Sequence, residues 1–174
     1  MRWRDLFSDL EGQLGAAADA QFAADVAERT RGERASIALG ARLAAALGSA
    51  VVITLVDGES VSGTLSDSAA TWVLVNEPRR QCWIPIAAVA TVGGLAQRAV
   101  VVTAVARGLS VGHAMRALSR ARAQVVVFTQ AGQHVGVIGQ VGADYLELAA
   151  REAPGPTAIP FASILRVVSA AADA

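Results

Sequence analysis

Cationic and aromatic side chains gather in the central part of this sequence, and their chemistry is that of anion binding. Residues 78–143 contain seven arginines and no aspartate or glutamate. Arginines bind phosphate groups, and an aromatic ring beside them stacks on nucleobases. Alternatively, this charge is solvated and balanced by residues 1–77, which hold eleven acids and six arginines. The candidate nucleic-acid-binding residues are Arg79, Arg80, Trp83, Arg98, His113, Arg116, Arg120 and Arg122.

Three of these residues fall on one side of a predicted helix. His113, Arg116 and Arg120 lie at positions i, i+3 and i+7, a spacing that brings side chains onto one helix face. This face offers positive charge to RNA or to an acidic protein partner; its alternative interpretation is an ordinary solvated helix face. The apolar residues of the same segment form the opposite side: Val111, Met115 and Leu118.

Arg79, Arg80 and Trp83 combine cations and an aromatic ring on a predicted hairpin. One interpretation is phosphate contact with base stacking, as in proteins that bind single-stranded nucleic acid. The other is an exposed loop followed by a core tryptophan. The apolar neighbours of Trp83 favour the second interpretation.

Catalytic chemistry finds no support in the sequence. The chain has two histidines and one cysteine, and its carboxylates are scattered. These residues form no nucleophile triad, metal-ligand spacing or phosphate loop. We therefore expect no enzyme activity, no catalytic residue, no metal site and no cofactor. The single Cys82 excludes an internal disulfide and is typical of a small core residue.

An amphipathic helix is predicted over residues 1–35. It packs either on its own chain or on a partner, and the sequence leaves both alternatives open. The N-terminus has no apolar signal region and no apolar run is long enough to span a membrane, so we expect a cytoplasmic protein without membrane contact. The apolar stripe, with spacings of three and four, consists of Trp3, Leu6, Phe7, Leu10 and Leu14.

Beyond this helix, the sequence repeats one pattern twice. Each copy has a leading helix and about five short strands of alternating hydrophobicity, with glycine turns between them. Landmarks that recur in one order, with offsets that change only in turns and loops, indicate an internal duplication. At offsets of 73 to 75 residues, Gly63 superposes on Gly136, Trp72 on Tyr145, Gly58 on Gly132, and Ile84-Pro85 on Ile159-Pro160.

Five short strands with exposed edges favour closure into a small barrel, because closure hides unpaired backbone groups. Pro85 and Pro160 then mark a sharp corner between strand four and a short strand five, since proline cannot donate a hydrogen bond to a sheet. The predicted fold is mainly β with helices: two tandem small five-stranded barrels, each preceded by a helix, of the SH3 type and, by the resemblance described next, Sm-like. The predicted domains are the N-terminal helix at 1–35, the first barrel at 36–95 and the second at 96–174.

Residues 51–92 resemble the Sm-like family, including its Hfq-type bacterial RNA chaperones. The second copy resembles it less closely. The resemblance implies RNA binding, and assembly in which strand four of one barrel pairs with strand five of the next. Two barrels in one chain would contact each other and satisfy part of that pairing internally. The similarity lies in the Val51/Ile53/Leu55 alternation, the Asp57-Gly58 turn, the Val61-x-Gly63-x-Leu65 pattern and the strand ending Val73-Leu74-Val75.

The base-binding positions of that family carry other residues here. The resemblance implies an Asp and an Asn in the strand 2–3 region and an Arg-Gly in the last strands, where Hfq-type proteins also place a Lys-His pair. The polar base pocket is therefore absent from both copies. The residues at the corresponding positions are Ala69, Val73, Pro85 and Ile86 in the first copy and Gly142, Leu146, Pro160 and Phe161 in the second.

Two functions follow as expectations. The first is a non-catalytic regulatory protein that binds RNA or another nucleic acid through its arginine-rich surfaces. The second is a protein-interaction or assembly module without nucleic-acid binding. In either case we expect a homo-oligomer, formed through barrel edge strands or the N-terminal helix.

Overall fold

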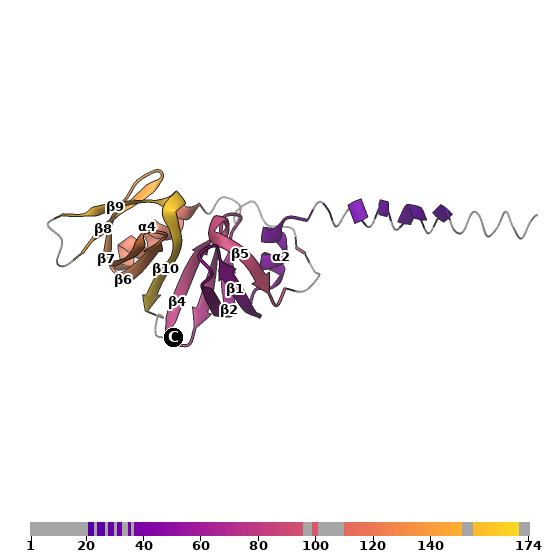
Figure 1. Cartoon of the computed structure of the whole chain (residues 1–174), viewed down its shortest axis with the longest axis horizontal. Helices are drawn as coiled ribbons and strands as arrows, with labels where there is room; N and C mark the ends of the chain where they lie inside the picture. Colours follow the sequence, from indigo (N-terminus) through magenta and orange to yellow (C-terminus); the bar gives the residue numbers. More distant parts are fainter. Residues whose placement is uncertain are drawn as a thin grey trace, which may run out of the picture. The chain divides into compact units, whose positions relative to one another are not determined.

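Ten strands form one antiparallel sheet in the order β5-β1-β2-β3-β4-β10-β6-β7-β8-β9 (Figure 1). The computed structural model describes residues 21, 22, 24–26, 28, 29, 31, 32, 35, 37–95, 99–100, 110–150 and 155–170. The strands are β1 Ala50–Leu55, β2 Ser60–Ser68, β3 Trp72–Glu77, β4 Arg80–Pro85, β5 Val89–Gly93, β6 Gln124–Thr129, β7 Gly132–Val141, β8 Tyr145–Ala149, β9 Thr157–Pro160 and β10 Ile164–Ala170. The helices beside the sheet are α2 Leu39–Ala45 and α4 Val111–Ala121, with the short 3-10 helices η1 Ile86–Ala88 and η2 Phe161–Ser163.

Residues 39–174 form one unit and residues 1–38 another. The described residues between 21 and 35 are helical. Within the described part of the chain, no helix is long and apolar enough to cross a membrane. The predicted partner-helix residues lie outside the described residues: Trp3, Leu6, Phe7, Leu10 and Leu14.

The predicted repetition is visible in the backbone. Gly63 and Gly136 both lie against the next strand, where an added Cβ would overlap the carbonyl oxygen of Asn76 and of Ala149 respectively. Gly58 and Gly132 both have positive φ in hairpin turns, which glycine adopts without steric cost. The first half of the sheet consists of β1–β5 and the second half of β6–β10. Both halves therefore use glycine for the same turn and the same close strand contact.

Pro85 and Pro160 make the same corner in both halves, as predicted. Each ends a strand and precedes a 3-10 turn, after which the next strand begins. The N–H of Ile86 donates to the carbonyl of Thr71 at 2.9 Å, and the N–H of Phe161 donates to that of Asp144 at 2.8 Å. A proline suits this position because its φ is fixed near the observed values of −68° and −62°.

The prediction of two closed five-stranded barrels is wrong, although the mainly β class is correct. The sheet is continuous and open, with β5 and β9 at its two edges. The physical reason is the pairing of β4 with β10, which joins Trp83 to Val167 and Cys82 to Val168. This pairing covers the free edges of both strands, so the halves hide each other's backbone groups instead of closing separately. The two halves therefore contact each other, as predicted.

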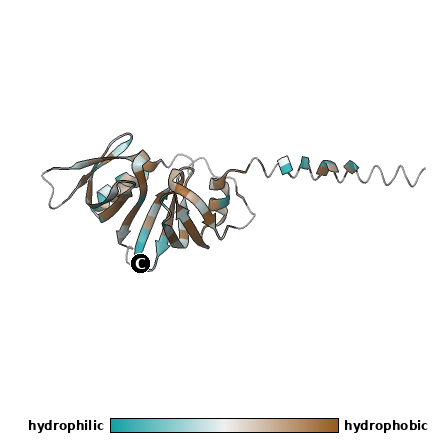
Figure 2. Ribbon diagram, in the orientation of Figure 1, coloured by the Kyte–Doolittle hydropathy of each residue, from teal (hydrophilic) through white to brown (hydrophobic). Residues whose placement is uncertain are grey.

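Strands β3 and β4 are buried on both faces because a separate apolar cluster covers each face. Val73, Val75, Cys82 and Ile84 pack into the core of the first half, together with Leu43 from α2. The alternate residues Trp72 and Trp83 pack instead with Met115, Val127 and Leu146 of the second half. Figure 2 shows hydrophobic residues along the strands of this region. Side chains on opposite faces of one strand thus belong to two different cores.

Candidate functional site

Helix α4 is fixed to the sheet by its apolar side. Gly112 and Met115 are buried, and Val111 and Leu118 pack against the second core. The Ser119 hydroxyl donates to the Gly139 carbonyl of β7 at 3.0 Å. The helix predicted from the Val111, Met115 and Leu118 spacing is therefore confirmed, and its remaining side faces solvent.

Three predicted binding residues lie on the solvent side of α4, and a fourth, Arg122, follows its last residue. We name these four the α4 basic face: His113, Arg116, Arg120 and Arg122. All four are exposed. Arg122 ends the helix in the left-handed conformation, with φ 49°. Among the described residues, no ion pair involves any of the four. The charges of Arg116, Arg120 and Arg122 are therefore available to a partner.

The other predicted residues lie elsewhere. Arg79 and Arg80 are exposed at the β3–β4 turn, where Arg80 forms an ion pair with Glu77. The hydrogen bond to Glu77 raises the pKa of Arg80. Trp83 is only 4% exposed, so it is a core tryptophan and not an exposed ring beside Arg79 and Arg80. Arg98 lies outside the described residues.

A groove of about 330 Å³ lies between α4 and strands β2–β4 and β10. We name it the α4 groove. His113, Ala114, Ala117 and Leu118 line it from the helix. From the sheet it is lined by Asp67, Trp72, Leu74, Gln81, Trp83, Val167 and Ser169. The two indole rings are in contact, with centroids 6.3 Å apart and planes at 37°. The groove thus combines aromatic walls with a few polar groups, the composition typical of ligand sites.

The indole N–H of Trp83 is buried, and no described residue accepts its hydrogen bond. A buried donor without an acceptor costs about 1–3 kcal/mol. Such groups are rare in folded proteins, and each one calls for an explanation. In this protein the unsatisfied donor belongs to a residue that lines the α4 groove.

Two polar side chains of the groove retain hydrogen-bonding capacity. One carboxylate oxygen of Asp67 accepts the Ser68 N–H at 2.7 Å. The Gln81 amide nitrogen donates to the Asn76 side chain at 3.2 Å, which leaves the Gln81 oxygen as an acceptor. The groove therefore offers both donors and acceptors beside its apolar walls.

Cys82 is 1% exposed and carries no reactive thiolate. Burial raises the pKa of its thiol to about 12, because desolvation disfavours the charged form. A protonated thiol is a poor nucleophile and a poor metal ligand. Among the described residues, no group of three or more His, Cys, Asp or Glu side chains is placed to hold a metal ion.

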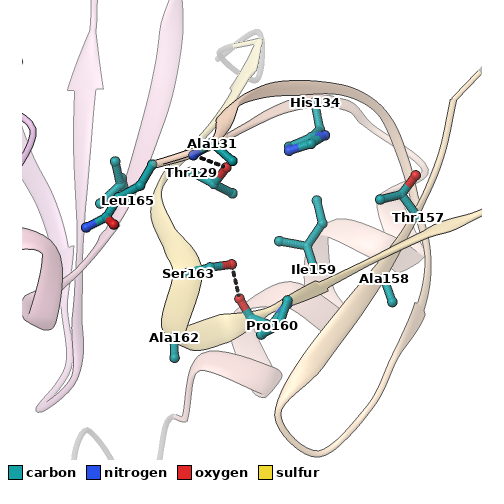
Figure 3. Close-up of a pocket in the computed structure, with 11 residues that line it drawn as sticks. Thr129, Ala131, His134, Thr157, Ala158, Ile159, Pro160, Ala162, Ser163 and Leu165 are labelled. Carbon is teal, nitrogen blue, oxygen red and sulfur yellow. Dashed lines mark hydrogen bonds between the residues drawn. The ribbon is translucent and has the colours of Figure 1, made fainter.

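A second hollow, of about 550 Å³, lies beside β9 (Figure 3). His134 and Ile159 line it, and Figure 3 shows their side chains pointing toward one another across it. Two of its polar side chains are already engaged: Thr129 Oγ1 donates to the Gly132 carbonyl at 3.1 Å, and Ser163 Oγ to that of Pro160 at 2.9 Å. With one titratable side chain and, among the described residues, no buried unsatisfied donor, this hollow offers less chemistry than the α4 groove.

The sequence prediction did not identify the groove residues Asp67, Trp72, Leu74 and Gln81. A signal was present in β3 and β4, where apolar residues occupy consecutive positions instead of alternating. Such runs indicate strands that are covered on both faces. That signal predicts a covering element but not which segment supplies it.

No protein-family model matches this chain, and no curated protein matches it. The resemblance to the Sm-like family accordingly stays a prediction.

Proposed function

We propose that this chain is a non-catalytic regulatory protein that binds single-stranded RNA through the α4 basic face. The observation that carries the proposal is the exposure of Arg116 and Arg120 on α4 and of Arg122 at its C-terminal end, without an ion-pair partner among the described residues. Guanidinium groups bind phosphate through charge-assisted hydrogen bonds. Several of them on one face suit a polyanion better than a single small anion.

The anchoring of α4 supports the same proposal. Met115 is fully buried and Ser119 is bonded to β7, so the helix presents its basic face from a fixed position. A face that is already ordered loses less entropy when it binds. Arg79, exposed at the β3–β4 turn, is a secondary phosphate contact in this proposal, whereas Arg80 is engaged by Glu77.

The test is the salt dependence of binding to a fluorescently labelled single-stranded RNA, measured by anisotropy. Replacing Arg116 and Arg120 together by alanine removes two phosphate contacts, and the slope of log K against log salt should fall by about 1.4. The matched control replaces the same residues by lysine, which keeps the charges and should keep most of the slope. Unchanged binding by the alanine variant would contradict the proposal, as would absence of RNA binding at low salt.

A second candidate function is self-assembly through the open sheet edges β5 and β9. The β4·β10 pairing favours it, because β5 corresponds to β10 and β9 to β4 at an offset of 75 residues. A second copy of the chain could then repeat the internal pairing at the outer edges. If β5 of one copy pairs with β9 of the next in the register that β10 and β4 use, Val92 lies opposite Ala158 and Gly93 lies opposite Thr157.

Cysteine cross-linking tests this register. Paired residues of neighbouring strands have Cα atoms about 5 Å apart, within the usual disulfide range. Oxidation of the Val92→Cys, Ala158→Cys double variant should therefore give covalent multimers, while each single variant gives at most dimers. Only monomers from the double variant, with a monomeric mass in light scattering, would contradict the assembly function.

A further inference from the structure

The α4 groove and the α4 basic face are continuous, because His113 belongs to both. Ala117 lines the groove one turn further along the helix, and Arg120 follows His113 on the exposed side. The side chain of Arg116 folds back toward Gly112, where an added Cβ would meet its guanidinium at 3.4 Å. The arginines do not line the groove themselves; they lie on the helix that forms its wall, and His113 connects their face to the groove.

The groove favours a flat ring with polar edges. Its apolar lining comes from Trp72, Leu74, Trp83, Leu118 and Val167. Its volume of about 330 Å³ lies at the small end of ligand sites, which span about 300–1,000 Å³. A compact planar heterocycle suits such a space better than an extended peptide.

The polar groups of the groove match the edge of a nucleobase. Trp83 supplies a donor that no described residue satisfies, and Asp67 and Gln81 supply acceptor oxygens. Nucleobases carry donors and acceptors side by side on one edge. An aliphatic or phenyl side chain of a protein partner would leave the Trp83 N–H without an acceptor.

We propose that the α4 groove receives one unpaired nucleobase of a bound RNA strand, and that entry of the base moves the groove wall enough for the base edge to accept the hydrogen bond of the Trp83 indole, which is covered in the unbound protein. The phosphates next to that base then lie on the α4 basic face. This inference rests on the proposed RNA-binding function and adds a base-binding site to it. Positive charge beside an apolar groove is complementary to a nucleotide, which joins an apolar ring to an anionic phosphate.

Intrinsic tryptophan fluorescence provides the test, because Trp72 and Trp83 both line the groove. In full-length protein carrying Trp3→Phe, the probes are uridine and adenosine 5′-monophosphates and, as a neutral apolar ring, benzene. We expect saturable quenching by at least one nucleotide. Ala117→Phe, which fills the groove from an exposed position, should abolish this quenching. Ala121→Phe lies on the same helix outside the groove lining and should not.

Trp83→Phe examines the hydrogen bond itself. It keeps an aromatic ring and removes the N–H, so nucleotide affinity read from Trp72 fluorescence should fall about three- to tenfold. If this variant does not fold, the Ala117→Phe result decides. Unchanged nucleotide quenching in Ala117→Phe would overturn the inference. So would stronger quenching by benzene than by either nucleotide, which would indicate an apolar side chain of a protein partner.

The two proposals fail in different ways. If RNA and an abasic ribose-phosphate oligomer bind equally well, and Ala117→Phe changes neither affinity, the base site is wrong while phosphate binding through α4 stands. If no RNA binds at low salt, the proposed function is wrong and the base site falls with it. If the abasic oligomer binds at least tenfold more weakly than RNA, and Ala117→Phe removes that difference, the inference is supported.

Discussion

The two halves of the sheet share their backbone plan and differ in what covers their outer face. In both, a glycine lies against the next strand, a proline ends strand four and a 3-10 turn follows. In the first half, the outer face of β3 and β4 carries Trp72, Leu74 and Trp83, which pack with the second core or line the α4 groove. The corresponding residues of the second half are Tyr145, Glu147 and Ala158.

This difference separates two kinds of constraint. Positions that set the backbone are the same in both copies, because turns, corners and close strand contacts tolerate few residue types. Positions on the outer face follow the neighbour that covers them. The aromatic pair of the first half packs with the second core, to which α4 contributes Met115, and the α4 groove lies between this pair and α4.

The largest expected difference between the halves concerns the residues Trp72 and Tyr145. Trp72 is 6% exposed, so Trp72→Ala should destabilise the protein by about 3–5 kcal/mol. Tyr145 is only half-buried, and Tyr145→Ala should cost about 1 kcal/mol because less apolar area is lost. Urea denaturation of both variants measures this difference. Equal losses of unfolding free energy in the two variants would show that the outer faces of the two halves are equally covered.

Because the two halves share their backbone conformation at the paired glycines, replacing either glycine should lower the free energy of unfolding by the same amount. Gly63→Ala and Gly136→Ala should each destabilise by about 2–3 kcal/mol, since the added methyl overlaps a strand carbonyl. Gly139→Ala is the control, because its Cβ would lie 3.8 Å from the nearest atom, and it should cost less than about 0.5 kcal/mol. A twofold or greater difference between Gly63 and Gly136 in denaturation experiments would break the equivalence.

Alkaline pH should weaken the protein through Cys82, whose counterpart Thr157 does not titrate. Burial raises the pKa of Cys82 from 9.0 to about 12. Above pH 9 the unfolded thiol ionises while the folded thiol stays protonated, so stability is present below pH 9 and is lost as pH rises toward 12. At a pH of about 10.5 the loss should reach about 2 kcal/mol. The difference in unfolding free energy between wild type and Cys82→Ala measures it; parallel pH profiles would contradict the buried thiol.

The smallest effect on stability is expected from the ion pair between Glu59 and Arg166. The atoms Arg166 Nη2 and Glu59 Oε2 are 3.8 Å apart, and the Glu59 side chain is 66% exposed. Water screens such a pair, so Glu59→Gln should change stability by less than about 0.5 kcal/mol. Arg166 is held instead by the Phe128 ring, 4.1 Å from the guanidinium carbon. A loss above 1 kcal/mol in thermal or urea unfolding would assign the ion pair a structural role that its exposure argues against.

The strands, the glycine turns and the Pro85 and Pro160 corners could be predicted from sequence because they depend on local backbone chemistry. Closure could not. Whether five strands close or remain open depends on the partner of β4, and that partner, β10, lies about eighty residues further along the chain. Nothing local to β4 distinguishes an edge that closes on its own half from one that pairs with the other half.

The candidate site was predictable in part for the same reason. The spacing of His113, Arg116 and Arg120 identified the basic face, since one helix determines it. The groove depends on where α4, which packs on β7, lies relative to β3 and β4 of the other copy. The apolar neighbours of Trp83 predicted its burial, which is confirmed, whereas its place beside α4 and its unsatisfied N–H follow only from the packed structure.

Amide chemical-shift mapping during an RNA titration tests the central claim most directly, because it compares α4 with the rest of the sheet in one spectrum. The account predicts that the largest shifts on adding single-stranded RNA fall on residues 111–122 and on the groove strands β3 and β4. It also predicts small shifts on β8 and β9. Shifts confined to β8 and β9, or no shifts between 111 and 122, would contradict it.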